Sequence, residues 1–142
     1  MVYKIPRAMG YKGKEEMVRY VIESEAKGDV FEEPYARTVR HLAAPWTLGT
    51  TKLWLGTDEI QPHNSSNPHV HEDQEEVFFF LSGRGRVKVD GEEIQVGPGY
   101  CVFCPQGSTH QVLNDGDEVL RFVAANSPPF KLNKYRATHL LK

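Results

Sequence analysis

The sequence predicts an all-β protein, and two observations lead to that fold class. From about residue 50 onward, short strand-like segments follow one another at regular spacing along the chain. Glycine, proline and Asp-Gly pairs separate these segments, and such residues are preferred in tight turns between strands. Regular short strands joined by such turns are typical of an all-β barrel or sandwich.

The first 45 residues do not share this pattern. Residues 13–29 fit either an amphipathic helix ending at Gly28 or a strand around residues 18–23, and the sequence does not decide between them. Residues 37–42, RTVRHL, are expected to form a strand. We therefore predict two parts: residues 1–45 as an N-terminal extension that packs on the barrel or on a partner subunit, and residues 46–142 as the barrel domain.

The next two strands are TKLWLG at residues 51–56 and EVFFFL at residues 76–81. In the second strand, alternation places Glu76, Phe78 and Phe80 on one face and the apolar residues between them on the other. Both faces are largely apolar, so both need to be covered. One face would line the barrel lumen, and a second copy of the chain or the N-terminal extension would cover the other. A homodimer is therefore expected.

Residues 86–96 form the clearest hairpin, with Asp90-Gly91 in a type I′ turn. This register places Val87 opposite Ile94, and it places Lys88 opposite Glu93, which has the opposite charge. Three further strands are expected at residues 100–105, 110–114 and 118–126.

Two cysteines, Cys101 and Cys104, lie in one of these strands. Positions three apart on a strand face opposite sides, about 10 Å apart. That distance is too great for a disulfide, so we expect inert thiols rather than a redox pair.

Residues 67–83, NPHVHEDQEEVFFFLSG, contain the candidate chemistry. His69 and His71 share one face of an extended strand, close enough to bind one ion. Parity selects Glu76 rather than Glu75 as a third ligand on that face, and His110, which follows a Pro/Gly turn, is the candidate for a fourth. The remaining acids of this stretch are expected to be solvated loop residues: Glu72, Asp73 and Glu75.

Here the residues resemble the cupins, over roughly residues 50–126. In the first cupin motif, a His-x-His pair precedes a glutamate and then a glycine six residues on, and this chain has His69, His71, Glu76 and Gly83 at that spacing. The second motif matches at every defined position: Gly99, Pro105, Gly107, His110 and Asn114. The resemblance implies a cupin double-stranded β-helix, or jelly-roll, barrel with an N-terminal extension. It also implies the same four metal ligands.

One position departs from the family pattern. The glycine that opens the first motif would fall at position 63, where this chain has His63. Histidine tolerates a left-handed backbone better than most residues, so His63 could be structural and solvent-exposed. The alternative is that it lines the barrel mouth and contacts substrate. Asn114 is expected to shape the turn into Asp115-Gly116.

Three imidazoles and one carboxylate form an N3O ligand set for one divalent transition metal ion. Iron or manganese suits such a set with open positions for water or substrate, and nickel, cobalt or zinc could also bind. Phe78 and Phe80 are expected to line the substrate pocket, together with Trp54 or Leu55 and with Tyr100 or Cys101 according to parity. Such a lumen suits a planar organic substrate better than a highly hydroxylated sugar.

The composition excludes several other classes of function. The chain has 142 residues, 25% of them charged, and a formal net charge of −2 without a basic block, which gives no case for a nucleic-acid partner. The sequence has no apolar run long enough for a membrane span and no apolar signal core at its N-terminus, so we expect a cytoplasmic protein.

The leading hypothesis is a metal-dependent enzyme of dioxygenase type acting on a small organic substrate. A metal-dependent isomerase or decarboxylase of a sugar or carboxylate is the second hypothesis. A non-catalytic small-molecule-binding or sensor protein is the third, since one fold hosts many functions. Beyond the ligands, the sequence identifies no acid or base.

Overall fold

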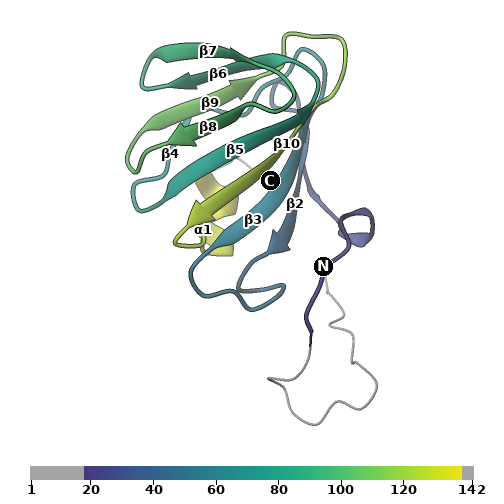
Figure 1. Ribbon diagram of the computed structural model, residues 1–142, viewed down its shortest axis with the longest axis vertical. Helices are drawn as coiled ribbons and strands as arrows, with labels where there is room; N and C mark the ends of the chain where they lie inside the picture. The colour runs from purple at the N-terminus through teal and green to yellow at the C-terminus, as the bar shows by residue number, and fades with distance from the viewer. Residues whose placement is uncertain (1–17, 139–142) are drawn as a thin grey trace.

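Two antiparallel β-sheets enclose the core (Figure 1). The structure is a computed structural model, which describes residues 18–138. One sheet has six strands in the order β1-β2-β3-β10-β5-β8, and the other has four in the order β4-β9-β6-β7. The strands are β1 (Asp29–Phe31), β2 (Arg37–Ala43), β3 (Trp54–Ile60), β4 (His69–Val70), β5 (Glu75–Ser82), β6 (Gly85–Val89), β7 (Glu92–Val96), β8 (Cys101–Cys104), β9 (Thr109–Leu113) and β10 (Leu120–Ser127). The all-β jelly-roll prediction is confirmed.

The predicted N-terminal extension contributes strands to the larger sheet. Strand β2 pairs with β3 along its length, with Arg37 opposite Ile60, and β1 pairs with β2. The strand predicted at residues 37–42 is therefore confirmed, and β1 and β2, within residues 29–43, are strands of the larger sheet.

The segment before β1 is predicted to be either a helix or a strand. The part of it that the structure describes, residues 18–28, forms neither. Residues 18–28 contain a single 3-10 turn, η2 (Glu23–Glu25), and residues 13–17 lie outside the described range. Side-chain bonds hold this segment: Arg121 donates to Glu23 at 2.6 and 2.8 Å, and Arg19 donates to the Leu48 carbonyl at 3.0 Å. Contacts with the barrel, rather than local propensity, determine its conformation.

Strand β5 alternates as the sequence predicts. Glu76, Phe78 and Phe80 are buried, whereas Val77 and Phe79 on the other face are exposed. The inner rings pack on Phe122 of β10, with centroids 5.3 Å away for Phe78 and 4.9 Å for Phe80. Each such side chain contributes about 1.5–3 kcal/mol of hydrophobic stabilisation.

The predicted hairpin and cysteine geometry are also confirmed. Val87 pairs with Ile94 and Lys88 with Glu93. Asp90 and Gly91 have φ values of 47° and 83°, as a type I′ turn requires. The cysteines are free thiols, Cys101 exposed and Cys104 buried.

Strand β3 lies further along the chain than predicted, at residues 54–60 rather than 51–56. Its second half, TDEI, is mostly polar, and Asp58 faces the interior with Trp54 and Ile60. Because a polar residue occupies an inward-facing position, the alternation of apolar residues does not indicate a strand there.

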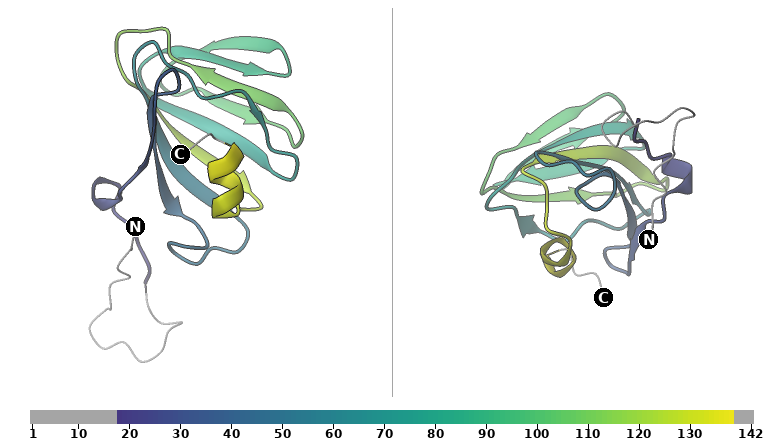
Figure 2. Two further views of the ribbon diagram at one scale, coloured as in Figure 1. Left: turned by 180° about the vertical axis from the view of Figure 1, so that it is seen from behind. Right: turned by 90° about the horizontal axis from the view of Figure 1, so that it is seen from below.

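A C-terminal segment without strand character closes the barrel. After β10 the chain passes through Phe130 into helix α1 (Leu132–Thr138), which packs against the barrel (Figure 2). Phe130 lies 5.4 Å from Trp54, and Tyr135 lies 4.9 Å from His41, measured between ring centroids. Both side chains are buried, so they belong to the core. Within residues 18–138, no helix is long and apolar enough to span a bilayer.

Candidate metal centre

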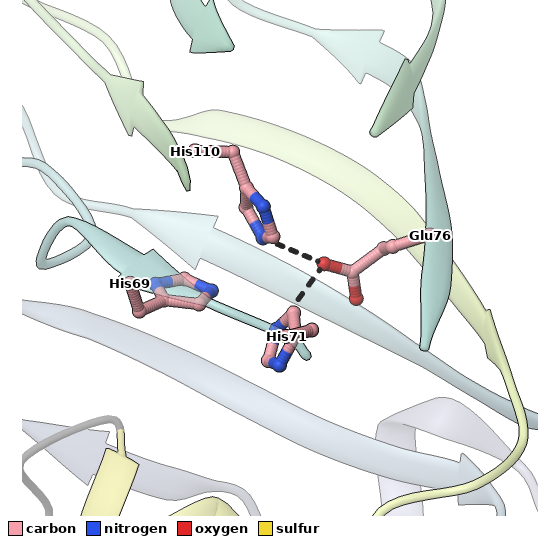
Figure 3. Close-up of side chains that lie close together, drawn as sticks. All are labelled: His69, His71, Glu76 and His110. Carbon is pink, nitrogen blue, oxygen red and sulfur yellow. Dashed lines mark ion pairs between the residues drawn. The ribbon is translucent and has the colours of Figure 1, made fainter. Parts of the chain in front are cut away.

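Three neighbouring strand segments bring four ligand-type side chains together. His69 on β4 lies directly opposite His110 on β9, His71 follows β4, and Glu76 points inward from β5. One ligand atom from each residue lies within 4.8 Å of the others. Figure 3 shows the three imidazoles and the carboxylate turned toward a common point.

The spacing of these groups suits one ion. Oε1 of Glu76 lies 3.1 Å from Nε2 of His110 and 3.6 Å from Nε2 of His71. The His69 ring is 4.4 Å from the His110 ring and 4.6 Å from the His71 ring, between centroids. An ion bound at about 2.0–2.2 Å holds its ligands roughly 3–4 Å apart, so only small inward shifts are needed.

Neighbouring polar groups orient two of the four side chains. Nδ1 of His69 lies 2.7 Å from the carbonyl oxygen of Asn67. Because a carbonyl can only accept, Nδ1 carries the hydrogen and Nε2 is left with its lone pair. Asn126 on β10 donates to Oε2 of Glu76 at 3.1 Å, which leaves Oε1 on the side of the histidines.

Burial keeps the imidazole of His71 in the neutral form that binds metal. Glu76, His71 and His110 are at most 5% exposed. Desolvation lowers the pKa of His71 to about 4, so its imidazole is neutral at pH 7. Both ring nitrogens of His110 are buried without a hydrogen-bond partner, although Glu76 is close. A buried polar atom without a hydrogen-bond partner destabilises the fold, and a bound cation would provide Nε2 of His110 with a partner.

A small cavity adjoins His69 and Glu76 inside the barrel. Its free volume is about 30 Å³, enough for about two water molecules. Most of its wall is apolar or aromatic: Val39, Trp54, Phe78, Val112, Phe122, Ala124, Phe130 and Tyr135. Phe78 therefore lies where the sequence predicts, and Trp54 rather than Leu55 faces inward. Phe80 is buried behind this wall, so its contact with substrate stays a prediction. Tyr100 and Cys101 face outward.

The sequence analysis missed two charged residues in this cavity. Arg37 is 2% exposed and donates to the Tyr35 carbonyl and to Oδ1 of Asn67, both at 3.2 Å. Its Nε lies 3.9 Å from Oδ2 of Asp58, too far for a hydrogen bond. Burial raises the pKa of Asp58 to about 7, opposed by Arg37. Had the predicted strand extended to residue 60, its alternation would have placed Asp58 on the same inward face as Trp54.

His63 lies apart from the other candidate site residues. It adopts φ = 59° in the turn after β3, as the motif glycine would allow. Its Nε2 lies 2.9 Å from Oδ1 of Asp117, and both side chains are mostly exposed. It does not line the cavity at the candidate centre, and a substrate contact stays a prediction.

Asn114 has the structural role that the sequence predicts. Asn114 donates to the carbonyls of Ile60 and Glu118 at 3.0 and 2.8 Å, and its Oδ1 accepts from the Gly116 amide. The acids expected to be solvated are all exposed: Glu72, Asp73 and Glu75.

The protein is a jelly roll with a candidate mononuclear metal centre. Its two antiparallel sheets surround an inward-facing cluster of three histidines and one glutamate. The chain belongs to the cupin family, because the family model described as "Cupin domain" matches residues 56–126. That range holds all four candidate ligands.

Several known proteins are similar to this chain. The tetracenomycin polyketide synthase protein TcmJ of Streptomyces glaucescens is 30% identical over 91 residues, which cover 64% of this chain and 61% of that protein. The oxalate-binding protein of Thermotoga maritima is 29% identical over 84 residues, covering 59% of this chain and 69% of that protein. The structure of the polyketide cyclase RemF from Streptomyces resistomycificus matches with a TM-score of 0.67 and 27% identity, covering 86% of this chain and 93% of that one.

Proposed function

We propose that His69, His71, Glu76 and His110 hold one divalent transition metal ion and that the chain is a metal-dependent enzyme. Its substrate is a planar, oxygen-rich organic molecule that contacts the metal through a carbonyl, enol or carboxylate oxygen. The observation that carries this proposal is the convergence of the four side chains beside an aromatic cavity. Iron or manganese is the proposed ion, because the N3O set leaves positions open for substrate.

The chain's own residues would prepare the site for such a substrate. A bound divalent ion would supply Lewis acidity to polarise a substrate oxygen. Trp54, Phe78 and Phe122 exclude water and would stack against a flat ring. Across the cavity, Asp58 can exchange a proton near neutral pH because its pKa is raised to about 7, and Arg37 presents positive charge to a substrate oxygen.

The reaction class we favour is a non-redox rearrangement, such as a cyclisation or isomerisation of a polyketide-like substrate. The names of two similar proteins support this choice: TcmJ is a polyketide synthase protein, and RemF is a polyketide cyclase. Their sequence identity to this chain is 30% and 27%, and the chain spans about three fifths of TcmJ, so substrate and reaction are proposals for this chain.

A dioxygenase, which the sequence analysis favoured, is the second candidate. The observation in its favour is the small, mostly apolar cavity of about 30 Å³ beside His69 and Glu76, which would accept a diatomic molecule. The two candidates differ in their need for oxygen.

One experiment separates these reactions. The metal-loaded protein is mixed with a panel of hydroxylated aromatic and polyketide-like compounds under air and under nitrogen. Turnover without oxygen consumption, equal in both atmospheres, is the result expected for the rearrangement. Turnover only under air with oxygen uptake would establish the dioxygenase instead. No binding and no turnover with any compound would contradict the proposed substrate class.

We also propose that a second copy of the chain covers the outer face of β5 and β8. Val77 lies opposite Phe103 and Phe79 opposite Cys101, and all four side chains are exposed on the outer face. β8 is an edge strand of its sheet, so its far side has no strand partner within residues 18–138. A two-fold axis would bring two such apolar stripes together, and the absence of charge on these four residues favours a like surface over a charged partner.

A further inference from the structure

Two separate spaces adjoin the candidate metal centre, and they share a wall. The inner one is the cavity of about 30 Å³ beside His69 and Glu76. The outer one, about 260 Å³, lies at the barrel mouth and is lined by His71 and by residues of the C-terminal segment. Phe130 and Tyr135 line both spaces. These two side chains are therefore common to the walls of both spaces.

Phe130 is the member of this wall that lies against the centre. Its ring centroid is 4.8 Å from that of His71 and 5.4 Å from that of Trp54, and the residue is 6% exposed. Tyr135 packs instead on His41, with centroids 4.9 Å apart. A molecule in the outer space therefore lies against His71 and the ring of Phe130 together.

The inner cavity is too small for an organic substrate. Its volume suits a ligand of two or three heavy atoms, because each water-sized position needs roughly 10–15 Å³ by this measure. Sites for drug-sized ligands have volumes of about 300–1,000 Å³. The outer space approaches that range, and joining it to the inner cavity would place a ring-sized site directly at the centre.

We propose that Phe130 determines ligand specificity, because its ring limits the size of the molecules that reach the metal. A planar aromatic ligand must displace it, whereas a triatomic ligand need not. This inference rests on the proposed metal site and deepens the proposed substrate class.

The segment that carries Phe130 belongs to neither sheet, so its displacement would leave the strand pairing intact. It follows the end of β10 and leads into the seven-residue helix α1, and neither is a strand of either sheet. The pair of Lys134 with Asp73, at 3.5 Å, is solvent-exposed and contributes little stability. Arg136 pairs at 3.3 Å with Asp29, whose side chain is only 15% exposed, so this pair and the buried rings provide most of the resistance to movement.

The test uses cobalt(II)-loaded protein, because the visible absorption of cobalt reports ligand binding. Wild type, Phe130→Ala and Leu132→Ala are titrated with azide and with 4-nitrocatechol, a planar bidentate ligand. Leu132 is the matched control: it lies on the same segment and packs on the core but lines neither space. Phe130→Leu, which keeps more of the packing, is the second variant should Phe130→Ala fail to fold.

The proposal predicts that Phe130→Ala binds 4-nitrocatechol at least about tenfold more tightly than wild type, since steric differences in apolar pockets have effects of that size. Phe130→Leu should show a smaller gain, and azide affinity should change by less than about twofold in every variant. Equal catechol affinity in wild type and Phe130→Ala would overturn the proposal, as would an equal gain in Leu132→Ala. Failure of catechol to bind any variant would also overturn it. Retained cobalt and azide binding would show that the metal site itself is intact, which separates this failure from failure of the proposed function.

Discussion

Asn126 on β10 donates a hydrogen bond of 3.1 Å to Oε2 of Glu76 on the neighbouring strand β5. The two residues are directly paired across the sheet, and both are buried. The bond engages one carboxylate oxygen and leaves the other, Oε1, 3.1 Å from Nε2 of His110. The larger sheet therefore fixes the only carboxylate of the candidate centre.

Asn126→Ala is expected to weaken metal affinity by about 10–100-fold while leaving the fold intact, because groups that orient a ligand have effects of that size. The measurement is competition with a chromophoric chelator, and Ser127→Ala, one residue along and exposed, is the control. Wild-type affinity in Asn126→Ala would show that Glu76 does not need this bond.

Asp58 makes the stability of the metal-free protein depend on pH. The pKa of Asp58 is raised from 3.8 to about 7, mainly by burial, with Arg37 opposing the rise and the carboxylates of Glu76 and Glu59 adding to it. Between these pKa values the folded state holds the proton more tightly than the unfolded state. The free energy of unfolding therefore falls as pH rises from about 4 to about 7, and the loss is complete above that window.

The variant Asp58→Asn has no such group. The free energy of unfolding of the variant minus that of wild type should be greater at about pH 8 than at about pH 4. The increase should be of the order of a few kcal/mol, since one pKa unit corresponds to about 1.4 kcal/mol. Urea denaturation of the metal-free proteins at the two pH values measures this difference. The same stability difference at both pH values would contradict the raised pKa.

His63 occupies a backbone conformation that suits glycine, with φ = 59°. His63→Gly should leave the stability equal or raise it by up to about 1 kcal/mol, because a left-handed conformation costs a residue with Cβ about that much. His63→Val should lower it, since a β-branched residue tolerates this region poorly. Asp117→Asn controls for the exposed ion pair with His63. A loss of stability in His63→Gly that Asp117→Asn does not share would refute this view of the turn.

The proposed dimer predicts that a charge on the outer face of β5 separates the subunits. Phe79→Glu should sediment as a monomer and wild type as a dimer, because Phe79 is 44% exposed at the centre of the apolar stripe. Val30→Glu is the control, since Val30 is also exposed but lies on β1 at the opposite edge of the sheet. A monomeric wild type would mean that something other than a second copy covers this face.

The sequence was sufficient to predict the candidate ligands because two independent signals coincide there. Strand alternation places Glu76 rather than Glu75 on the inner face, and the motif spacing to Gly83 selects the same residue. The hairpin register was predictable for a similar local reason, since Asp90-Gly91 fixes which residues face each other.

What the sequence did not reveal depends on contacts distant in the chain. Asp58 is a polar residue that faces inward, so a strand predicted from apolar residues ends before it, at residue 56 rather than residue 60. Phe130 and Tyr135 have no periodic signal, and only the barrel mouth they fill gives them a role. Residues 18–28 are held by Arg121 and Arg19, which no local propensity could indicate.

The central claim is that four side chains hold one metal ion, and metal analysis of three proteins tests it most directly. Wild type, Glu76→Gln and Glu75→Gln are purified without chelator, incubated with ferrous or manganous ion, desalted and analysed for bound metal. Glu76 is buried beside the histidines, whereas its neighbour Glu75 is exposed on the other face of β5. The account predicts close to one transition metal ion per chain in wild type and in Glu75→Gln, and little or none in Glu76→Gln. Loss of metal in Glu75→Gln with retention in Glu76→Gln, or a wild type without metal, would contradict it.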